Sequence, residues 1–175
     1  MNLEGLISNI VELDSKSILI GQSRKRRILI FSTESDKQIK EINNIELALN
    51  KYAVSKISKD YAGIAGEEKL KACIFILSIK NKIICKKFFV NEMNICKNLT
   101  TLNNNYFLIT GKDSEIEKYS DLALLKFEIE SDEIIIKQIS NFKRGYCNDV
   151  EGIISVNNYI IGLGSSLELR LWEIA

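Results

Sequence analysis

The feature that most constrains the fold of this chain is an internal repeat of about 45 residues. Four segments each place four mostly apolar residues between a larger residue and a glycine. The glycines are Gly21, Gly66, Gly111 and Gly164, spaced by 45, 45 and 53 residues. A period of this size is typical of proteins built from similar units, each too small to bury its own apolar face. The repeat therefore predicts units that pack against one another.

Each unit is predicted to contain four short β-strands. After each glycine a polar loop leads into a second apolar run, at 27–33, 72–79, 122–130 and 167–175. In three units a further β-rich stretch follows, at 37–42, 82–90 and 133–140. Four short strands in about 45 residues are the signature of a β-propeller blade. We therefore predict an all-β fold of four-stranded antiparallel blades across residues 1–175, at approximately 5–42, 51–90, 95–140 and 150–175.

The third strands predict blades that are covered on both faces. The first of them has Ile28 and Ile30 on one face and Leu29 and Phe31 on the other. A sheet with one face in water would alternate polar and apolar residues instead. We also expect four residues to occupy equivalent, largely buried positions: Phe31, Leu77, Phe127 and Trp172.

One segment carries a competing signal. Ile45, Ala48, Leu49, Tyr52 and Ala53 have the spacing of an apolar stripe on a helix. The repeat requires the first strand of the second blade in this region, and we predict that strand at 52–57.

The end of the chain resembles the WD40 repeat. The third strand of a WD40 blade commonly ends in Leu-Trp-Asp and an apolar residue, and this chain has Leu171, Trp172, Glu173 and Ile174. Only this unit carries the tryptophan. Because the chain has no histidine, the Gly-His pair of the family and its hydrogen-bond network through histidine are missing. The resemblance implies a degenerate WD40-like propeller.

The resemblance also carries an expectation about ring size. WD40-like propellers usually have about seven or eight blades, whereas this sequence contains about four units, the last without a fourth strand. The implied ring would be completed by a longer polypeptide or by another molecule. We expect the outward faces of the first and fourth blades to be exposed and apolar, and the isolated chain to self-associate or aggregate.

Composition disfavours several other classes of protein. The 24 basic and 23 acidic residues leave a net charge of +1, with no overall attraction to nucleic acid or to an anionic membrane. Residues 1–13 do not form a signal peptide, so we expect a cytoplasmic, reducing location. The cysteines form no C-x-x-C pair, and we expect neither a metal site nor a cofactor. They are Cys73, Cys85, Cys96 and Cys147.

The sequence offers little basis for catalysis, and we expect the chain not to be an enzyme. Histidine, the commonest general base, is absent. Residues 162–166 resemble the opening of a phosphate-binding loop but lack the third glycine and a following helix. The carboxylate pairs Glu67-Glu68 and Asp132-Glu133 fall in predicted loops, where we expect solvated turn residues.

Candidate partner-binding residues lie in the loops that vary between units. In a propeller, the loops between second and third strands and the connections between blades emerge on one face. Here these segments are 22–26, 67–70, 112–120 and 141–149, and variable loops on a rigid scaffold usually carry recognition. Aromatic residues beside arginine are typical of binding hot spots. The candidate residues are Arg24, Lys25, Arg26, Arg27, Phe142, Lys143, Arg144 and Tyr146.

Each candidate group also has a structural interpretation. The basic run could be a solvated hairpin loop, and the two aromatic residues could pack beneath their own loop. Our leading hypothesis is a non-catalytic scaffold or adaptor that binds protein partners through this face. The alternatives are a regulatory propeller within a larger enzyme-containing polypeptide, and an RNA- or phosphate-binding propeller that uses residues 24–27. No aromatic residues interleave with that basic run, which disfavours single-stranded nucleic acid.

Overall fold

The computed structural model describes ten segments of the chain, and all secondary structure elements in these segments are β-strands. These segments are residues 7–22, 27–34, 39–42, 53–102, 105–112, 121–131, 133–142, 150–156, 159–164 and 169–173. For residues 141–142 and for the last three segments, the structure describes the backbone. Tyr159 is the one residue among them whose side chain is also described. Within these segments no helix is long and apolar enough to cross a membrane.

The strands form four antiparallel sheets. Sheet one contains β1 (Ile7–Asp14), β2 (Ser17–Gln22), β3 (Arg27–Ser32) and β4 (Ile39–Glu41). Sheet two contains β5 (Ala53–Lys56), β6 (Tyr61–Glu68), β7 (Lys71–Ser78) and β8 (Ile83–Phe89). Sheet three contains β9 (Ile95–Thr101), β10 (Tyr106–Lys112), β11 (Asp121–Glu130) and β12 (Glu133–Phe142). Sheet four contains β13 (Val150–Val156), β14 (Tyr159–Gly164) and β15 (Leu169–Glu173).

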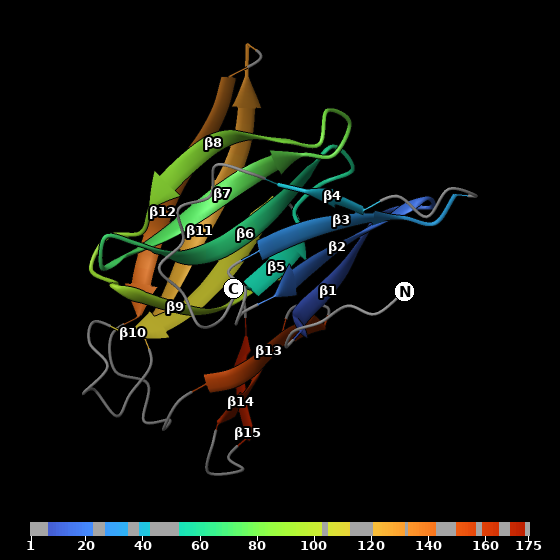
Figure 1. Ribbon diagram of the computed structural model, residues 1–175. Helices are drawn as coiled ribbons and strands as arrows, with labels where there is room; N and C mark the ends of the chain where they lie inside the picture. The colour runs from blue at the N-terminus through green and yellow to red at the C-terminus, as the bar shows by residue number, and fades with distance from the viewer. Residues whose placement is uncertain are drawn as a thin grey trace.

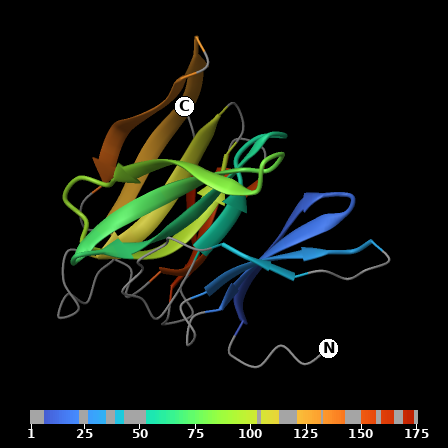
Figure 2. The same ribbon diagram turned by 45° about the horizontal axis from the view of Figure 1, so that its top comes forward.

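The sheets have the arrangement of propeller blades. In each sheet the strands pair in chain order, so that every strand is hydrogen-bonded to the next. The first strands β1, β5, β9 and β13 contact one another in that order. Figures 1 and 2 show sheets one to three fanned out side by side. The predicted all-β fold of propeller blades is therefore confirmed.

Two apolar cores fill the spaces on either side of sheet two. Cys73, Phe75 and Leu77 of β7 belong to the core shared with sheet one. The alternating residues Ile74 and Ile76 belong to the core shared with sheet three. All five are at most 4% exposed. Successive side chains of a strand point to opposite faces, so a blade between two neighbours must be apolar on both.

Backbone hydrogen bonds show that the repeat of the first unit is one residue out of register. The carbonyl oxygens of Lys16, Asp60 and Asn105, each just before a second strand, accept hydrogen bonds from the end of the third strand. The donor–acceptor distances are 2.7, 2.9 and 2.8 Å. Lys16 is thus equivalent to Asp60 and Asn105, although the sequence repeat aligns it with Tyr61 and Tyr106.

As a result, Gln22 and not Gly21 occupies the glycine position of the repeat in sheet one. Gln22 is 1% exposed, and its side-chain oxygen has no hydrogen-bond partner among the described residues. In sheet three the same position requires glycine. A Cβ at Gly111 would lie 2.0 Å from the carbonyl oxygen of Ile95 and 2.4 Å from the sulfur of Met93.

The predicted equivalence of third-strand residues holds for three sheets and is wrong for one. Phe31, Leu77 and Trp172 each pair with the second residue of the preceding strand. In sheet three that position belongs to Leu125, so the prediction for Phe127 is wrong by two residues. A slip of two preserves the face, and both side chains lie in the same core. Leu77 and Phe127 are buried as predicted, Phe31 is half-buried, and the side chain of Trp172 lies outside the described part of the chain.

The face of sheet one that turns away from sheet two is less open than predicted. Ile10 is 53% exposed and Phe31 is half-buried. Ile20 and Leu29 on the same face are only 3% and 4% exposed. The expectation of a broadly exposed apolar face is therefore wrong for β2 and β3. The self-association expected from it stays a prediction.

The first strand of sheet two forms where the repeat requires it. β5 lies within the predicted range 52–57, and it begins at Ala53, a residue of the competing helical stripe. The other residues of that stripe lie outside the described segments.

Candidate partner-binding surface

Most of the binding residues predicted from sequence lie outside the described segments. Arg27 begins β3, and its guanidinium lies 3.4 Å from the carboxylate of Glu41 in β4, an ion pair within sheet one. Phe142 ends β12, and its side chain is not among those described. The residues outside are Arg24, Lys25, Arg26, Lys143, Arg144 and Tyr146. All eight therefore stay predictions as binding residues.

Glu67 and Glu68 are strand residues, and their predicted position in a loop is wrong. They are the last two residues of β6 and are half-buried. The strand continues through this polar stretch because β6 stays paired with β7 up to the final residue pair. Glu133 also lies in a strand, as the first residue of β12, and Asp132 is not described.

The turn between β6 and β7 consists of two residues, Lys69 and Leu70. Their φ angles are 51° and 61°, so both adopt the left-handed conformation that a type I′ hairpin turn requires. Asn-Gly is favoured in such turns because the Cβ of most other residues costs about 1–2 kcal/mol there. Leu70 is in addition 79% exposed. The chain thus holds a leucine in a strained conformation at the tip of an exposed turn.

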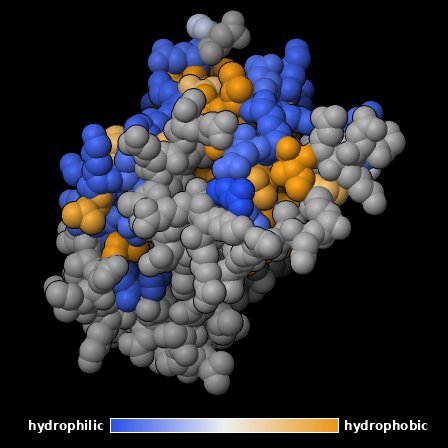
Figure 3. All heavy atoms as spheres, viewed as in Figure 1, coloured by the Kyte–Doolittle hydropathy of each residue, from blue (hydrophilic) through white to orange (hydrophobic). Residues whose placement is uncertain are grey.

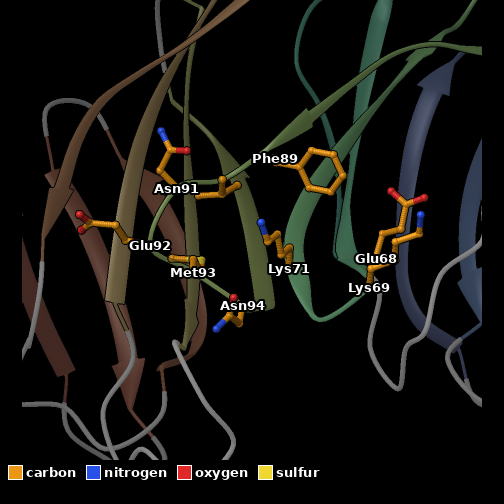
Figure 4. A pocket seen from close by; sticks show the side chains of 9 residues that line it. Glu68, Lys69, Lys71, Phe89, Asn91, Glu92, Met93 and Asn94 are labelled. Carbon is orange, nitrogen blue, oxygen red and sulfur yellow. The ribbon is translucent and has the colours of Figure 1, made fainter.

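A pocket of about 410 Å³ lies beside this turn (Figure 4). One wall comes from the end of β6 and the start of β7, and the other from the end of β8 and its connection to β9. Both segments belong to the loop face that the sequence predicts for recognition. The lining residues are Glu68, Lys69, Lys71, Phe89, Val90, Asn91, Glu92, Met93 and Asn94.

Backbone hydrogen bonds hold the connection between sheets two and three in place. The N–H of Val90 donates to the carbonyl oxygen of Ala72 at 2.9 Å, and the N–H of Ala72 donates to that of Met93 at 3.0 Å. The N–H of Asn94 donates to the carbonyl oxygen of Lys112 at 3.0 Å. Met93 itself is 1% exposed and belongs to the core between the two sheets. This wall of the pocket is therefore fixed by both neighbouring sheets.

A side chain of sheet three fixes the middle of the connection. The N–H of Asn91 donates to the side-chain oxygen of Gln138 at 2.9 Å, and the Gln138 amide donates back to the carbonyl oxygen of Asn91 at 3.5 Å. Glu92 follows with a φ of 59°. Two of the six described non-glycine residues with positive φ, Lys69 and Glu92, thus line this pocket, and a third, Leu70, follows Lys69 in the adjacent turn. Strained backbone of this kind clusters at functional sites.

Some charged side chains around the pocket form an ion pair with a described residue, and others do not. The ammonium group of Lys87 lies 2.7 Å from the carboxylate of Glu68 and 5.3 Å from the ring centre of Phe89. Lys87 thus neutralises Glu68 and packs over Phe89, which is 42% exposed. Lys69 and Lys71 are exposed and form no ion pair with any described residue. The rim therefore combines apolar surface with two lysines that have no ion-pair partner in the described segments.

One buried thiol lies close to this surface. Cys73 pairs with Phe89 across β7 and β8, and burial raises the pKa of its thiol to about 12. At neutral pH this thiol is protonated and is a poor nucleophile. The pocket lining offers apolar surface, amide groups, lysines and carboxylates. Figure 3 shows that the apolar surface of the described residues is divided into separate patches on the face in view.

Sequence reasoning missed Leu70 and Phe89 as candidates. The available signal was the stretch that follows Gly66, residues 67–72, which joins two strongly apolar runs. It contains no glycine, asparagine or proline. A hairpin that closes there must place ordinary residues in the left-handed region.

No protein-family model and no curated protein sequence matches this chain. Three natural proteins of known structure are similar to it in fold. Atg21, solved in complex with the coiled coil of Atg16, has a TM-score of 0.69 and 14% identity, covering 98% of this chain and 53% of its own. The Dos1 propeller has a TM-score of 0.63 and 14% identity, covering 96% and 42%. The hydrazine synthase of Kuenenia stuttgartiensis has a TM-score of 0.67 and 9% identity, covering 92% and 50%.

A designed protein is similar over nearly its whole length. The computationally designed Ika4 protein has a TM-score of 0.64 and 8% identity, covering 99% of this chain and 94% of its own. The chain thus spans about half the length of the three natural proteins and most of the designed one. At these identities the comparisons establish the fold alone: the chain is built of β-propeller blades.

Proposed function

We propose that this chain is a non-catalytic protein-binding module that contacts its partner through the turn-and-connection surface, formed by residues 68–71 and 89–94. One observation carries the proposal. Leu70 is held 79% exposed in a left-handed turn, and Phe89, 42% exposed, lines the pocket that lies next to this turn. Apolar side chains at a strained, solvent-facing turn gain little for the fold, whereas a partner that covers them gains their full burial.

The rigidity of the surface supports a binding role. Both walls are fixed by backbone hydrogen bonds or strand pairing, and the lining residues Val90 and Met93 are buried in the core. A preorganised surface loses little conformational entropy when a partner binds. The Atg21 structure adds support from the fold, since that protein was solved in complex with a coiled coil of another protein.

We further propose that the chain is a degenerate WD40-like propeller that works in the cytoplasm. Leu171, Trp172 and Glu173 lie in β15, the third strand of its sheet, where the WD40 pattern has Leu-Trp-Asp. The described cysteines are all unpaired, in keeping with a reducing compartment.

Affinity capture from the native cell, with matched variants, tests the binding proposal. Leu70→Ser and Phe89→Ala remove the two exposed apolar groups. Ile83→Ser and Ile129→Ser serve as controls, because these residues are 51% and 49% exposed beside turns on the opposite face. Quantitative mass spectrometry should find proteins retained by the wild type and both controls but lost from both test variants. A protein set that is unchanged by Leu70→Ser and Phe89→Ala would overturn the proposal.

A further inference from the structure

We infer that the partner presents an acidic peptide segment, with one large apolar side chain flanked by aspartate or glutamate. This inference rests on the proposed function and adds the chemical class of the partner. It is carried by two independent properties of the turn-and-connection surface: its exposed apolar side chains, and its two lysines without an ion-pair partner among the described residues.

The apolar contacts define the anchor. Phe89 forms a half-exposed aromatic wall of the pocket, and Val90 and Met93, 4% and 1% exposed, line it from within the core. Leu70 projects from the adjacent turn with 79% of its surface in solvent. A volume of about 410 Å³ falls in the lower part of the range of about 300–1,000 Å³ for ligand sites. It suits one large apolar side chain of a peptide that also passes over Leu70.

The charges define the flanking residues. Lys69 and Lys71 bracket Leu70 in the sequence, and neither forms an ion pair with a described residue. The carboxylate of Glu68 is already neutralised by Lys87 at 2.7 Å. In Figure 4, the second carboxylate of the lining, Glu92, points away from Lys71. A partner that buries Leu70 must therefore approach two cations, which favours acidic side chains on either side of its anchor.

Nucleic acid is the competing occupant for a surface with lysines and an exposed aromatic ring. Single-stranded binders stack successive bases on several aromatic rings. Among the described residues of the pocket lining, Phe89 is the one aromatic residue, and the exposed apolar side chain of Leu70 offers no flat face for stacking. The surface therefore favours a peptide.

The probe is a display library of random short peptides, selected on the intact 175-residue chain. Enriched peptides are resynthesised with a fluorophore, and their affinity is measured by anisotropy. The charge-reversal variant combines Lys69→Glu and Lys71→Glu. Lys80→Glu is its control, because Lys80 is exposed in the turn before β8 on the opposite face. Circular dichroism and urea unfolding verify that each variant is folded.

Enriched peptides should share an apolar residue flanked by aspartate or glutamate. The charge-reversal variant should weaken them about tenfold or more, as about 1.4 kcal/mol for two charges implies. Lys80→Glu should leave their affinity unchanged, and added salt should lower it.

Three results would count against the inference, and they separate it from the proposed function. Peptides that are lost with Leu70→Ser but insensitive to charge reversal would overturn the acidic partner and leave the binding surface in place. Peptides that bind Leu70→Ser as well as wild type, or no enrichment at all, would overturn both. An oligouridylate probe that competes with the selected peptides and is lost on charge reversal would assign the surface to nucleic acid.

Discussion

Installing Asn-Gly in place of Lys69-Leu70 should make the protein more stable while removing a binding group. Both residues have positive φ, at 51° and 61°, where the Cβ of most residues approaches a backbone carbonyl oxygen. Glycine has no Cβ, and asparagine tolerates this conformation better than lysine. Leu70 is mostly in solvent, so little packing is lost when its side chain is removed.

The expected magnitude follows from three terms. Relief of left-handed strain at Leu70 contributes about 1–2 kcal/mol. The greater freedom of glycine in the unfolded chain subtracts about 0.5–1 kcal/mol. The side chain is 79% exposed, so only about a fifth of a leucine's burial, about 0.3–0.6 kcal/mol, is lost. Leu70→Gly alone is then slightly stabilising, and with Lys69→Asn the free energy of unfolding should rise by about 1 kcal/mol.

The difference in stability between a glycine and an alanine variant should have opposite signs at the adjacent positions Leu70 and Lys71, which makes the test specific. At Leu70, glycine should be more stable than alanine, because alanine retains the strained Cβ. At Lys71, the first residue of β7, alanine should be more stable than glycine by about 0.5–1 kcal/mol, as in ordinary strands. Urea unfolding of the four single variants gives the order directly, and the Asn-Gly variant should melt about 2–4 °C higher than wild type. If Leu70→Ala equals or exceeds Leu70→Gly in stability, the turn is not strained as described.

Three further predictions concern the core and the thiols. Gly111→Ala should destabilise the protein by more than about 3 kcal/mol, because its Cβ would lie 2.0 Å from a backbone oxygen. Gly63→Ala should cost about 1 kcal/mol, because its Cβ would meet side-chain ends at 2.8 and 3.0 Å. Equal costs of the two variants in urea unfolding would contradict this reasoning. Gln22→Leu should stabilise by about 1 kcal/mol because it removes a buried oxygen without a partner, and a loss above about 1 kcal/mol would show that the amide is needed. Cys85 is surface-exposed as a residue and partial burial of its thiol raises the pKa, so its alkylation by iodoacetamide should increase as pH rises above neutral. Cys73, fully buried with a pKa of about 12, should stay unmodified until the protein unfolds, as peptide mapping would show.

The repeat predicts the strands well because it depends on two strong signals, turns and apolar runs. It misaligns a strand by one residue where neighbouring residues are apolar on both faces of the strand. The second strand of sheet one reads SILIGQ, with apolar residues on both faces, so a shift by one residue leaves the pattern almost unchanged. The pairing of β2 with β3 and the hydrogen bond from Thr33 to the carbonyl oxygen of Lys16 fix the alignment. A blade covered on both faces thus loses the alternation that specifies register elsewhere.

The candidate surface was predictable as a face of the propeller but not as a set of residues. Composition points to loops rich in arginine and aromatic residues, such as 24–27 and 142–146. It does not report φ or exposure, and the charged stretch around Leu70 predicts an ordinary loop. The strain at Leu70 arises because β6 and β7 stay paired up to Glu68 and Lys71, which leaves only two residues to reverse the chain. Pairing across the sheet therefore overrides local turn preference.

The same cores explain why the fold tolerates this strain. Val90 and Met93 belong to the core between sheets two and three, and Ala72, next to the turn, hydrogen-bonds to the carbonyl oxygen of Met93. To relax the turn at Leu70, the end of the β6–β7 hairpin would have to separate from this connection. Burial of one large apolar side chain contributes about 1.5–3 kcal/mol, which is comparable to or larger than the strain of one left-handed residue, about 1–2 kcal/mol. The core between sheets two and three therefore holds the backbone on both sides of the pocket, and the affinity for a partner should depend on how well it matches Leu70, Phe89 and the lysines next to Leu70.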